Sequence, residues 1–165
     1  MGRGRSLREP EELALVQNVF QSSLPSPFLR SKVMVTDSIG AQNREYTSIS
    51  AGIGVYQINM GDKAFDARAY TPSFKATLIH EMTHVWQGHH GRLGLIAVWG
   101  SSIICQIQRQ GNAYLYGEGN LNRKDWGDFG AEEQAQIVQD WYENGMLTTD
   151  PRFHFIRDNI RMGKT

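Results

Sequence analysis

Residues 74–87 read Phe-Lys-Ala-Thr-Leu-Ile-His-Glu-Met-Thr-His-Val-Trp-Gln, and the rest of the chain is organised around them. This stretch carries His80, Glu81 and His84 in the spacing H-E-x-x-H. Residues four apart lie on one face of a helix, so both imidazoles can bind one zinc ion. Glu81 is rotated by about 100° from His80. Its carboxylate can therefore act as a general base on an activated water without binding the metal.

The residues around this motif predict a buried helix over 73–87. Apolar side chains recur at near-helical spacing, at Phe74, Leu78, Ile79, Met82 and Val85. Pro72 and Ser73 suit a helix start, with Ser73 as a possible N-cap. The expected end is marked by three glycines, Gly88, Gly91 and Gly94. Without a metal, the same pattern would describe a helix with two hydrogen-bonded histidines and a surface glutamate.

Length and composition bound the class of protein. At 165 residues the chain is expected to form one domain whose core needs no disulfide, and the single cysteine, Cys105, is expected to be buried as a small hydrophobic residue. The net charge is zero, so bulk charge recruits neither nucleic acid nor an acidic membrane. Residues 1–12 are charged and lack the apolar segment of a signal peptide, and residues 1–8 look disordered. They are expected to be a disordered start or linker before a domain at 9–165.

The remaining pattern predicts an α+β domain that is mainly helical, with a small β-sheet beside the helix at 73–87. Further helices are expected at 10–22, 92–109, 131–144 and 151–162. Strands are expected at 32–36 and 49–59, and loops at 37–48, 61–72 and 110–130. The apolar run from Leu93 to Cys105 is too short to span a bilayer, so stable membrane insertion is not expected.

Two histidines leave a zinc ion short of a third protein ligand. One option is the extended motif H-E-x-x-H-x-x-G-x-x-H, in which His90 has the spacing of the third histidine but Gln87 replaces the turn glycine. The other option is a later carboxylate, from Glu118, Asp125, Asp128, Glu132, Glu133, Asp140 or Glu143. Glu132 shares a helix face with the small Ala135, and Glu133 shares one with larger apolar residues. Periodicity alone does not separate these two.

Three stretches of the chain resemble a group of bacterial zincins. These zincins occur as free-standing proteins and as C-terminal domains of type VI secretion spike (VgrG) and Rhs-type proteins. The stretches are Thr77 to Gln87, then Ala113-Tyr114-x-Tyr116, and then Glu132 to Tyr142. The resemblance extends from the N-terminal helix to about Glu143. Family sequences tend to read Glu-Gln-Gln-Ala where this chain has Glu-Glu-Gln-Ala, which registers Glu132 as the third zinc ligand and Glu133 as a departure.

The resemblance implies a zincin-like domain with a metallopeptidase site that binds Zn²⁺ through His80, His84 and Glu132. For the spike-attached members it also implies an antibacterial effector, made in the bacterial cytoplasm and delivered by the type VI system to the periplasm of a target cell. The partners implied are a peptide or protein substrate, a covalently attached spike protein and a cognate immunity protein.

The expected chemistry is metal-assisted hydrolysis of an amide, with Glu81 transferring the proton of the attacking water to the leaving amine. A neutral donor should stabilise the oxyanion, and Tyr114 and Tyr116 are the first candidates, followed by His154. The strand expected at 49–59 could pair with an extended peptide substrate.

Two other classes of function compete with the peptidase interpretation. The fold could serve as a non-catalytic zinc-binding adaptor on a secretion spike, although a purely structural zinc site has no need of Glu81. The apolar run at 93–105 could instead belong to a membrane-perturbing toxin. Peptidoglycan cross-links, a periplasmic protein and autoprocessing all remain open as substrates.

Overall fold

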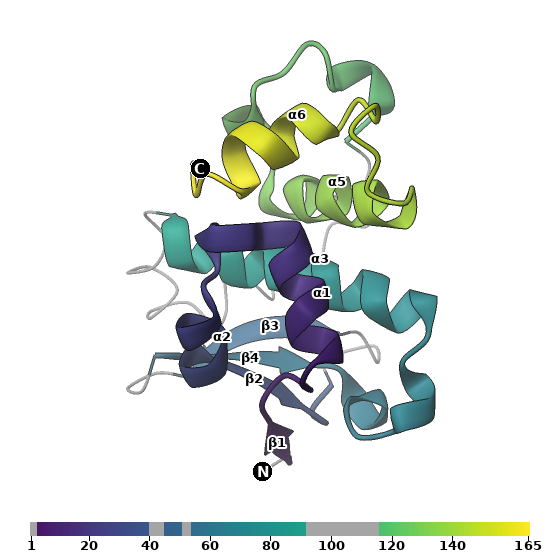
Figure 1. The fold of residues 1–165 in the computed structure, drawn as a ribbon. Coiled ribbons are helices and arrows are strands. Elements are labelled where there is room, and N and C mark those ends of the chain that lie inside the picture. Colours follow the sequence, from purple (N-terminus) through teal and green to yellow (C-terminus); the bar gives the residue numbers. More distant parts are fainter. Residues whose placement is uncertain (1–2, 40–44, 51–53, 92–115) are drawn as a thin grey trace.

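One long helix, α3 (Pro72–His90), lies at the centre of the computed structural model, between a small sheet on one side and α5 (Ala131–Glu143) on the other (Figure 1). The structure describes residues 3–39, 45–50, 54–91 and 116–165. The helix begins one residue before the expected start, because Thr71 is its N-cap and accepts a hydrogen bond from the backbone N–H of Phe74 at 3.2 Å. Pro72 then occupies the first turn, where its missing N–H costs nothing.

The helix also continues through Gly88, where the sequence predicted its end. That prediction is wrong because Gly88 serves close packing and not a turn. A Cβ atom at this position would lie 2.7 Å from Cε1 of Tyr56, so only glycine lets the ring of Tyr56 approach the helix backbone. The extra turn adds His89 and His90 to the helix.

The sheet has four strands in the order β1-β2-β4-β3. Their bounds are β1 Gly4–Arg5, β2 Val33–Thr36, β3 Tyr46–Ser50 and β4 Val55–Asn59. Strands β2 and β4 run parallel, and the two outer pairs are antiparallel. Within the described sheet β3 is therefore an edge strand, and it lies beside α3.

The predictions for this region were partly wrong. The strand expected at 32–36 is present as β2. The expected strand at 49–59 is instead the end of β3 and the whole of β4, which pair with each other, and Gly54 precedes β4 with a φ of +60°. The expected loop at 37–48 contains the start of β3. A sheet face that packs on a helix accepts a polar residue such as Thr47 when it finds a hydrogen-bond partner, which here is Glu81.

The helices that precede β2 pack against α3 and the sheet (Figure 1). Two short helices follow β1, namely α1 Glu11–Phe20, extended by the 3₁₀ turn Gln21–Ser23, and α2 Ser26–Lys32. The expectation of a disordered start is wrong for residues 3–8: Gly4 and Arg5 pair with β2, and the Arg5 guanidinium binds the buried carboxylate of Glu12 at 2.6 and 2.8 Å. An unpaired Glu12 would be costly in the core, so this ion pair fixes the N-terminal segment.

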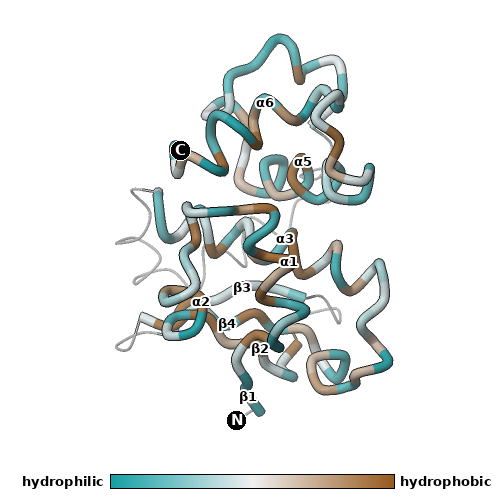
Figure 2. Tube along the Cα trace, viewed as in Figure 1, coloured by the Kyte–Doolittle hydropathy of each residue, from teal (hydrophilic) through white to brown (hydrophobic). Residues whose placement is uncertain are grey.

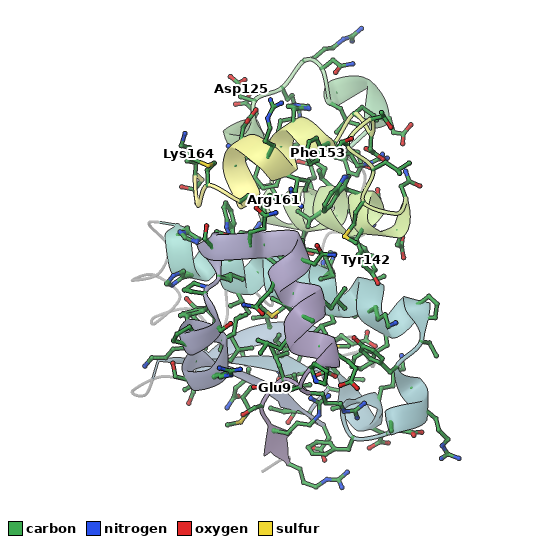
Figure 3. All side chains as sticks on the ribbon, viewed as in Figure 1. Glu9, Asp125, Tyr142, Phe153, Arg161 and Lys164 are labelled. Carbon is green, nitrogen blue, oxygen red and sulfur yellow. The ribbon has the colours of Figure 1, made fainter. Side chains whose placement is uncertain are left out.

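The C-terminal part of the chain packs on the other side of α3. After the 3₁₀ turns Glu118–Asn120 and Trp126–Asp128 come α5, the short α6 (Phe153–Phe155) and a π-helical turn at Ile156–Ile160. The indole N–H of Trp86 donates to the carbonyl of Ile160 at 2.9 Å and so ties this last segment to α3. Arg161 extends the contact by donating to the carbonyls of Asn18 and Val19 on α1 (Figure 3).

One hydrophobic core joins both sides of α3 (Figure 2). Its fully buried members include Val16, Phe20, Val35, Ile58, Ile79, Met82, Trp86, Ile137 and Ile160. The mixed helical architecture with a small sheet agrees with the expected α+β class, and the zincin-like assignment stays a prediction. The helix expected at 92–109, Cys105 and Tyr114 lie outside the described residues. In the part of the chain that the structure describes, no helix has the length and apolar character to cross a membrane.

Candidate metal centre

Three buried side chains converge between α3 and α5. Nε2 of His80 lies 3.2 Å from Oε2 of Glu132, and Nε2 of His84 lies 3.4 Å from Oε1 of the same carboxylate. One ligand atom from each residue lies within 4.8 Å of the other two. The spacing of four residues on α3 places both imidazoles on the face that packs against α5, and Glu132 meets them from the first turn of α5.

These distances suit a tetrahedral ion. Zinc bound at about 2.0–2.1 Å keeps neighbouring ligand atoms about 3.3 Å apart, which is close to the two separations between Glu132 and the imidazoles. A His₂Glu set is also a known donor set of catalytic zinc, and it leaves a fourth position for water. The three residues therefore fit a divalent cation such as zinc.

The charges point the same way. Burial lowers the pKa of His84, but the hydrogen bond and the negative charge of Glu132 outweigh it and raise this pKa to about 9. Burial raises the pKa of Glu132, but hydrogen bonds to His80 and His84 hold it well below its ordinary value. A carboxylate between two imidazoles thus stabilises positive charge among the three side chains, whether carried by a proton or by a metal.

Glu81 belongs to α3, directly after His80, and is also buried. Its Oε2 atom lies 2.7 Å from the hydroxyl of Thr47, which is also 3.1 Å from the Glu81 backbone carbonyl. Thr47 belongs to β3, so the edge strand fixes the carboxylate on the sheet side of α3 while His80 and His84 face α5. Glu81 is thereby held next to the centre without joining it.

Gln87 contacts His84, and Gln134 contacts Gln87. Nδ1 of His84 lies 2.8 Å from Oε1 of Gln87, whose Nε2 donates to the carbonyl of Ala131 and to Oε1 of Gln134, both at 2.9 Å. Gln134 in turn donates through Nε2 to the carbonyl of Trp126 at 2.9 Å. This row of hydrogen bonds links α3 to the first turn of α5.

The alternative third ligands are placed elsewhere. Glu133 accepts a hydrogen bond from the backbone N–H of Gly130 at 2.8 Å, which satisfies the N-cap residue of α5. His90 donates through Nε2 to the carbonyl of Ser23 at 2.8 Å. The structure therefore brings Glu132, and not Glu133 or His90, to the two imidazoles.

The candidate oxyanion donors lie apart from this group or outside the description. Tyr116 is buried, and its hydroxyl donates to Asp140 at 2.5 Å and accepts from Arg152 at 2.7 Å. Burial and then the Asp140 hydrogen bond raise the pKa of Tyr116, so its phenol stays neutral. His154 bonds the carbonyl of Pro151 at 2.7 Å on the surface. A role for Tyr114 or Tyr116 at the oxyanion stays a prediction.

The other candidate carboxylates also have partners away from the histidines. Glu118 pairs with Arg152, Asp140 accepts from Tyr116 and Gln136, and Asp125 and Asp128 close a capping box of their own. Glu143, at the end of α5, lies near Gln139. Among the residues that the structure describes, only His80, His84 and Glu132 form a cluster of potential ligands that could hold a metal ion.

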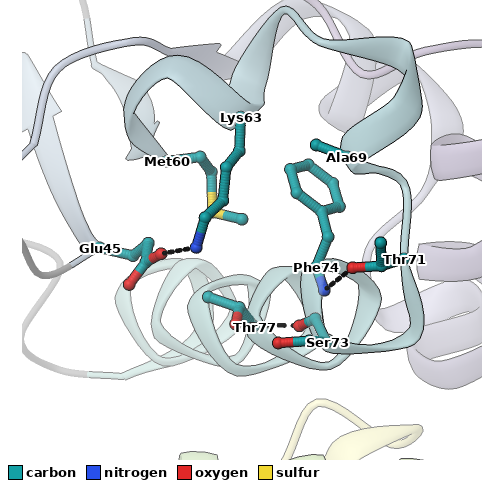
Figure 4. Close-up of a pocket in the computed structure, with 8 residues that line it drawn as sticks. All are labelled: Glu45, Met60, Lys63, Ala69, Thr71, Ser73, Phe74 and Thr77. Atoms are coloured by element: carbon teal, nitrogen blue, oxygen red, sulfur yellow. Dashed lines mark hydrogen bonds and ion pairs between the residues drawn. The ribbon is translucent and has the colours of Figure 1, made fainter.

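A pocket of about 170 Å³ lies beside the first turns of α3 (Figure 4). It is lined by Glu45, Met60, Lys63, Ala69, Thr71, Ser73, Phe74 and Thr77. Buried Met60 and Phe74 give it an apolar wall, and the ion pair between Glu45 and Lys63, at 3.2 Å, closes one side. Thr77 precedes Glu81 by one turn of the helix, and Glu45 directly precedes β3. The pocket therefore lies beside the first turns of α3, one helical turn before Glu81 and next to the start of β3.

Sequence reasoning missed Thr47, Gln87 and Gln134 as parts of the site. Thr47 lies in a segment that was expected to be a loop, although its β-branched neighbours in Tyr-Thr-Ser-Ile-Ser could have indicated a strand. Gln87 was noticed only as the residue that replaces a glycine of the extended motif. No local signal in the sequence pairs it with Gln134, which lies 47 positions further on.

Comparison with known proteins gives one informative similarity. Over 171 aligned positions, the chain is 26% identical to the type VI secretion system spike protein VgrG2b of Pseudomonas aeruginosa. The aligned region covers 97% of this chain but only 15% of the length of that spike protein. No family model matches the chain, and no solved structure matches it. Nearly the whole domain is thus similar to a small part of a much longer protein.

Proposed function

We propose that this protein is a zinc-dependent metallopeptidase with a zincin-like fold, whose centre is formed by His80, His84 and Glu132. One observation carries the proposal: a buried His-His-Glu group that fits a tetrahedral cation has a further buried carboxylate, that of Glu81, fixed beside it by Thr47. A structural zinc ion has no use for such an acid, whereas a hydrolase needs a base at this place.

The residues of the chain divide the work of hydrolysis between them. Zinc, when bound, supplies a Lewis acid that polarises the scissile carbonyl and lowers the pKa of water toward about 7. Glu81 accepts the proton of the attacking water and returns it to the leaving amine. The Thr47 hydroxyl, 2.7 Å from Oε2, holds the carboxylate in one orientation and leaves its other oxygen for this transfer. His84 is oriented through Gln87.

The edge strand supports a peptide as substrate. β3 lies at one edge of the described sheet, and its Thr47 contacts the base, so an extended peptide paired with β3 would pass directly in front of Glu81. The pocket beside Thr77 would then receive one side chain of that peptide, and its Met60 and Phe74 wall favours an apolar one.

The similarity to a spike protein supports a role in type VI secretion. We infer that the domain is an antibacterial effector carried by a spike, either joined covalently to it or delivered with it, and that it acts in the periplasm of the target cell. Such an effector would need an immunity protein in the producing cell.

The decisive experiment compares the zinc-loaded protein with its Glu81→Gln variant. Glutamine keeps a hydrogen-bond acceptor for Thr47 but cannot take a proton at neutral pH, so folding and zinc content should be retained while cleavage is lost. Cleavage is measured on periplasmic extracts and on purified peptidoglycan fragments, with chelator-treated protein as a second control. Growth of a bacterial host that exports each version to its periplasm gives an independent readout.

The competing functions predict different outcomes of the same experiment. A non-catalytic adaptor would show no cleavage by the wild type and no difference in growth between the two versions. A membrane-perturbing toxin would keep its toxicity and would release dye from liposomes with Glu81→Gln as well as with the wild type. Either result would overturn the peptidase proposal.

A further inference from the structure

We propose that Gln87 is the positioning residue of the metal centre. Its amide sets the tautomer of His84 so that Nε2 faces the ion, and it also docks the turn of α5 that carries Glu132. The inference rests on the metal centre of the proposed function but not on its peptidase activity. Gln87, which replaces the glycine of the extended zinc motif, would thus have a role of its own at the metal centre.

The orientation of the Gln87 amide follows from its neighbours. The backbone carbonyl of Ala131 carries no proton and can only accept, so the group that faces it at 2.9 Å must be the NH₂ of Gln87. The oxygen of the same amide must then face Nδ1 of His84 at 2.8 Å. An amide oxygen only accepts, so Nδ1 must carry a proton. The lone pair of the neutral imidazole is therefore on Nε2, the atom that faces Glu132.

A second carbonyl reinforces this order. The carbonyl of Trp126 accepts from the NH₂ of Gln134, which turns the Gln134 oxygen toward the NH₂ of Gln87. Both N–H groups of Gln87 are thereby used, one for Ala131 and one for Gln134, and its oxygen is used for His84. Two fixed carbonyls thus orient two amides and one imidazole in series, and reversing any member would bring two acceptors face to face.

The same amide couples the two helices of the centre. Ala131 and Gln134 stand on either side of Glu132 in the first turns of α5, and Gln87 binds both of them from α3. The side chain of Gln87 therefore helps to position both His84, three residues before it on α3, and Glu132, on α5. Partners of this kind, which orient a ligand without touching the metal, typically change metal affinity by about 10–100-fold when removed.

The test measures metal binding and not peptide cleavage. Gln87→Leu removes both functions of the amide. Gln139→Leu is the matched control, because it makes the same substitution on α5, where the Gln139 amide lies 3.5 Å from Glu143 and away from the histidines. We expect Gln87→Leu to weaken zinc binding by about 10–100-fold in competition with a chromophoric chelator. The control should lose less than about threefold, and the visible spectrum of the Co²⁺-substituted protein should change only in Gln87→Leu.

An NMR measurement needs no substitution and covers the case in which Gln87→Leu does not fold. In the zinc-loaded wild type, the imidazole ¹⁵N spectrum should show His84 with a proton on Nδ1 and the metal on Nε2. Metal on Nδ1 of His84, or equal zinc affinities for Gln87→Leu and the wild type, would overturn the positioning role. Both results are independent of whether Glu81→Gln abolishes cleavage, so this proposal and the peptidase proposal can fail separately.

Discussion

The two adjacent acids at the start of α5 offer a sharp test of the metal centre. Glu132 is 3% exposed and faces both imidazoles, whereas Glu133 caps its own helix through the N–H of Gly130. We therefore expect Glu132→Ala to remove most of the stabilisation that zinc gives to the protein, and Glu133→Ala to leave it intact. The two substitutions remove the same side chain one position apart, so each controls for the other.

The expected sizes follow from linkage. Zinc at 100 times its Kd stabilises the wild type by about 2.7 kcal/mol, and for a chain of this length each kcal/mol raises Tm by about 2–4 °C, which gives a rise of about 5–11 °C. A hundredfold loss of affinity in Glu132→Ala would reduce the gain at the same zinc concentration to about 0.4 kcal/mol, or about 1 °C. Loss of the cap in Glu133→Ala costs about 1 kcal/mol with or without zinc.

Differential scanning calorimetry, with zinc and with a chelator, measures these differences, and elemental analysis counts the zinc bound per chain. Glu133→Ala should melt about 2–4 °C below the wild type in both conditions and keep the full rise with zinc. The ligand assignment is refuted if Glu132→Ala keeps the rise, or if Glu133→Ala or His90→Ala loses it. If zinc does not raise the Tm of the wild type, the proposed metal centre is refuted.

Three further predictions concern the base, the pH dependence and the pocket. Thr47→Val removes a hydrogen bond to a carboxylate, which is worth about 1.5–3 kcal/mol, so kcat should fall by about 10–100-fold in steady-state assays while bound zinc is unchanged. An unaltered kcat would show that Glu81 does not need Thr47. In the metal-free protein the pKa of His84 is raised from about 6.5 in the unfolded chain to about 9. The contribution of protonated His84 to the free energy of unfolding is therefore complete below about pH 6.5 and is lost as the pH rises through 9. Urea titrations of the metal-free protein should show this decrease in stability with pH, and Glu132→Ala should lack it. Ala69→Trp fills the pocket, so cleavage of a peptide library should shift toward small side chains without loss of zinc; an unchanged profile would exclude the pocket as a subsite.

Much of the centre could be predicted because its signals are local. His80 and His84 are four residues apart, and the apolar residues around them have helical spacing, so the helix and the direction of both imidazoles follow from the sequence. The helices near 10–22 and 131–144 and the strand at 32–36 were predicted for the same reason. In each of these segments, one face of the element is marked by apolar residues at its own period.

The parts that could not be predicted depend on partners that are distant in the sequence. Thr47 reaches Glu81 only because β3 pairs with β4 in a register that places it beside α3. Glu132 and Glu133 differ by about 100° around α5, and only the packing of α5 on α3 decides which one meets the histidines. Gly88 reads as a helix breaker until the ring of Tyr56 is seen against it. Helix α2 was not predicted, although Pro27 lies in its first turn, where proline is favoured.

The division of the ligands between two helices links metal binding to folding. Two of the candidate ligands belong to α3, which the sheet and α1 already support. The third belongs to α5, which packs on α3 at the interface that carries Gln87, while Trp86 joins α3 to Ile160 in the last segment. Zinc can bind with full affinity only when this interface is formed, so part of the binding free energy must appear as stability of the contact between α3 and α5. If Glu81 is the base, as we propose, the base lies on the sheet side of α3 and Glu132 on the α5 side, so hydrolysis would take place between these two parts of the domain. Through Glu132, the C-terminal part of the chain thus supplies the third member of the His-His-Glu group on α3 and α5.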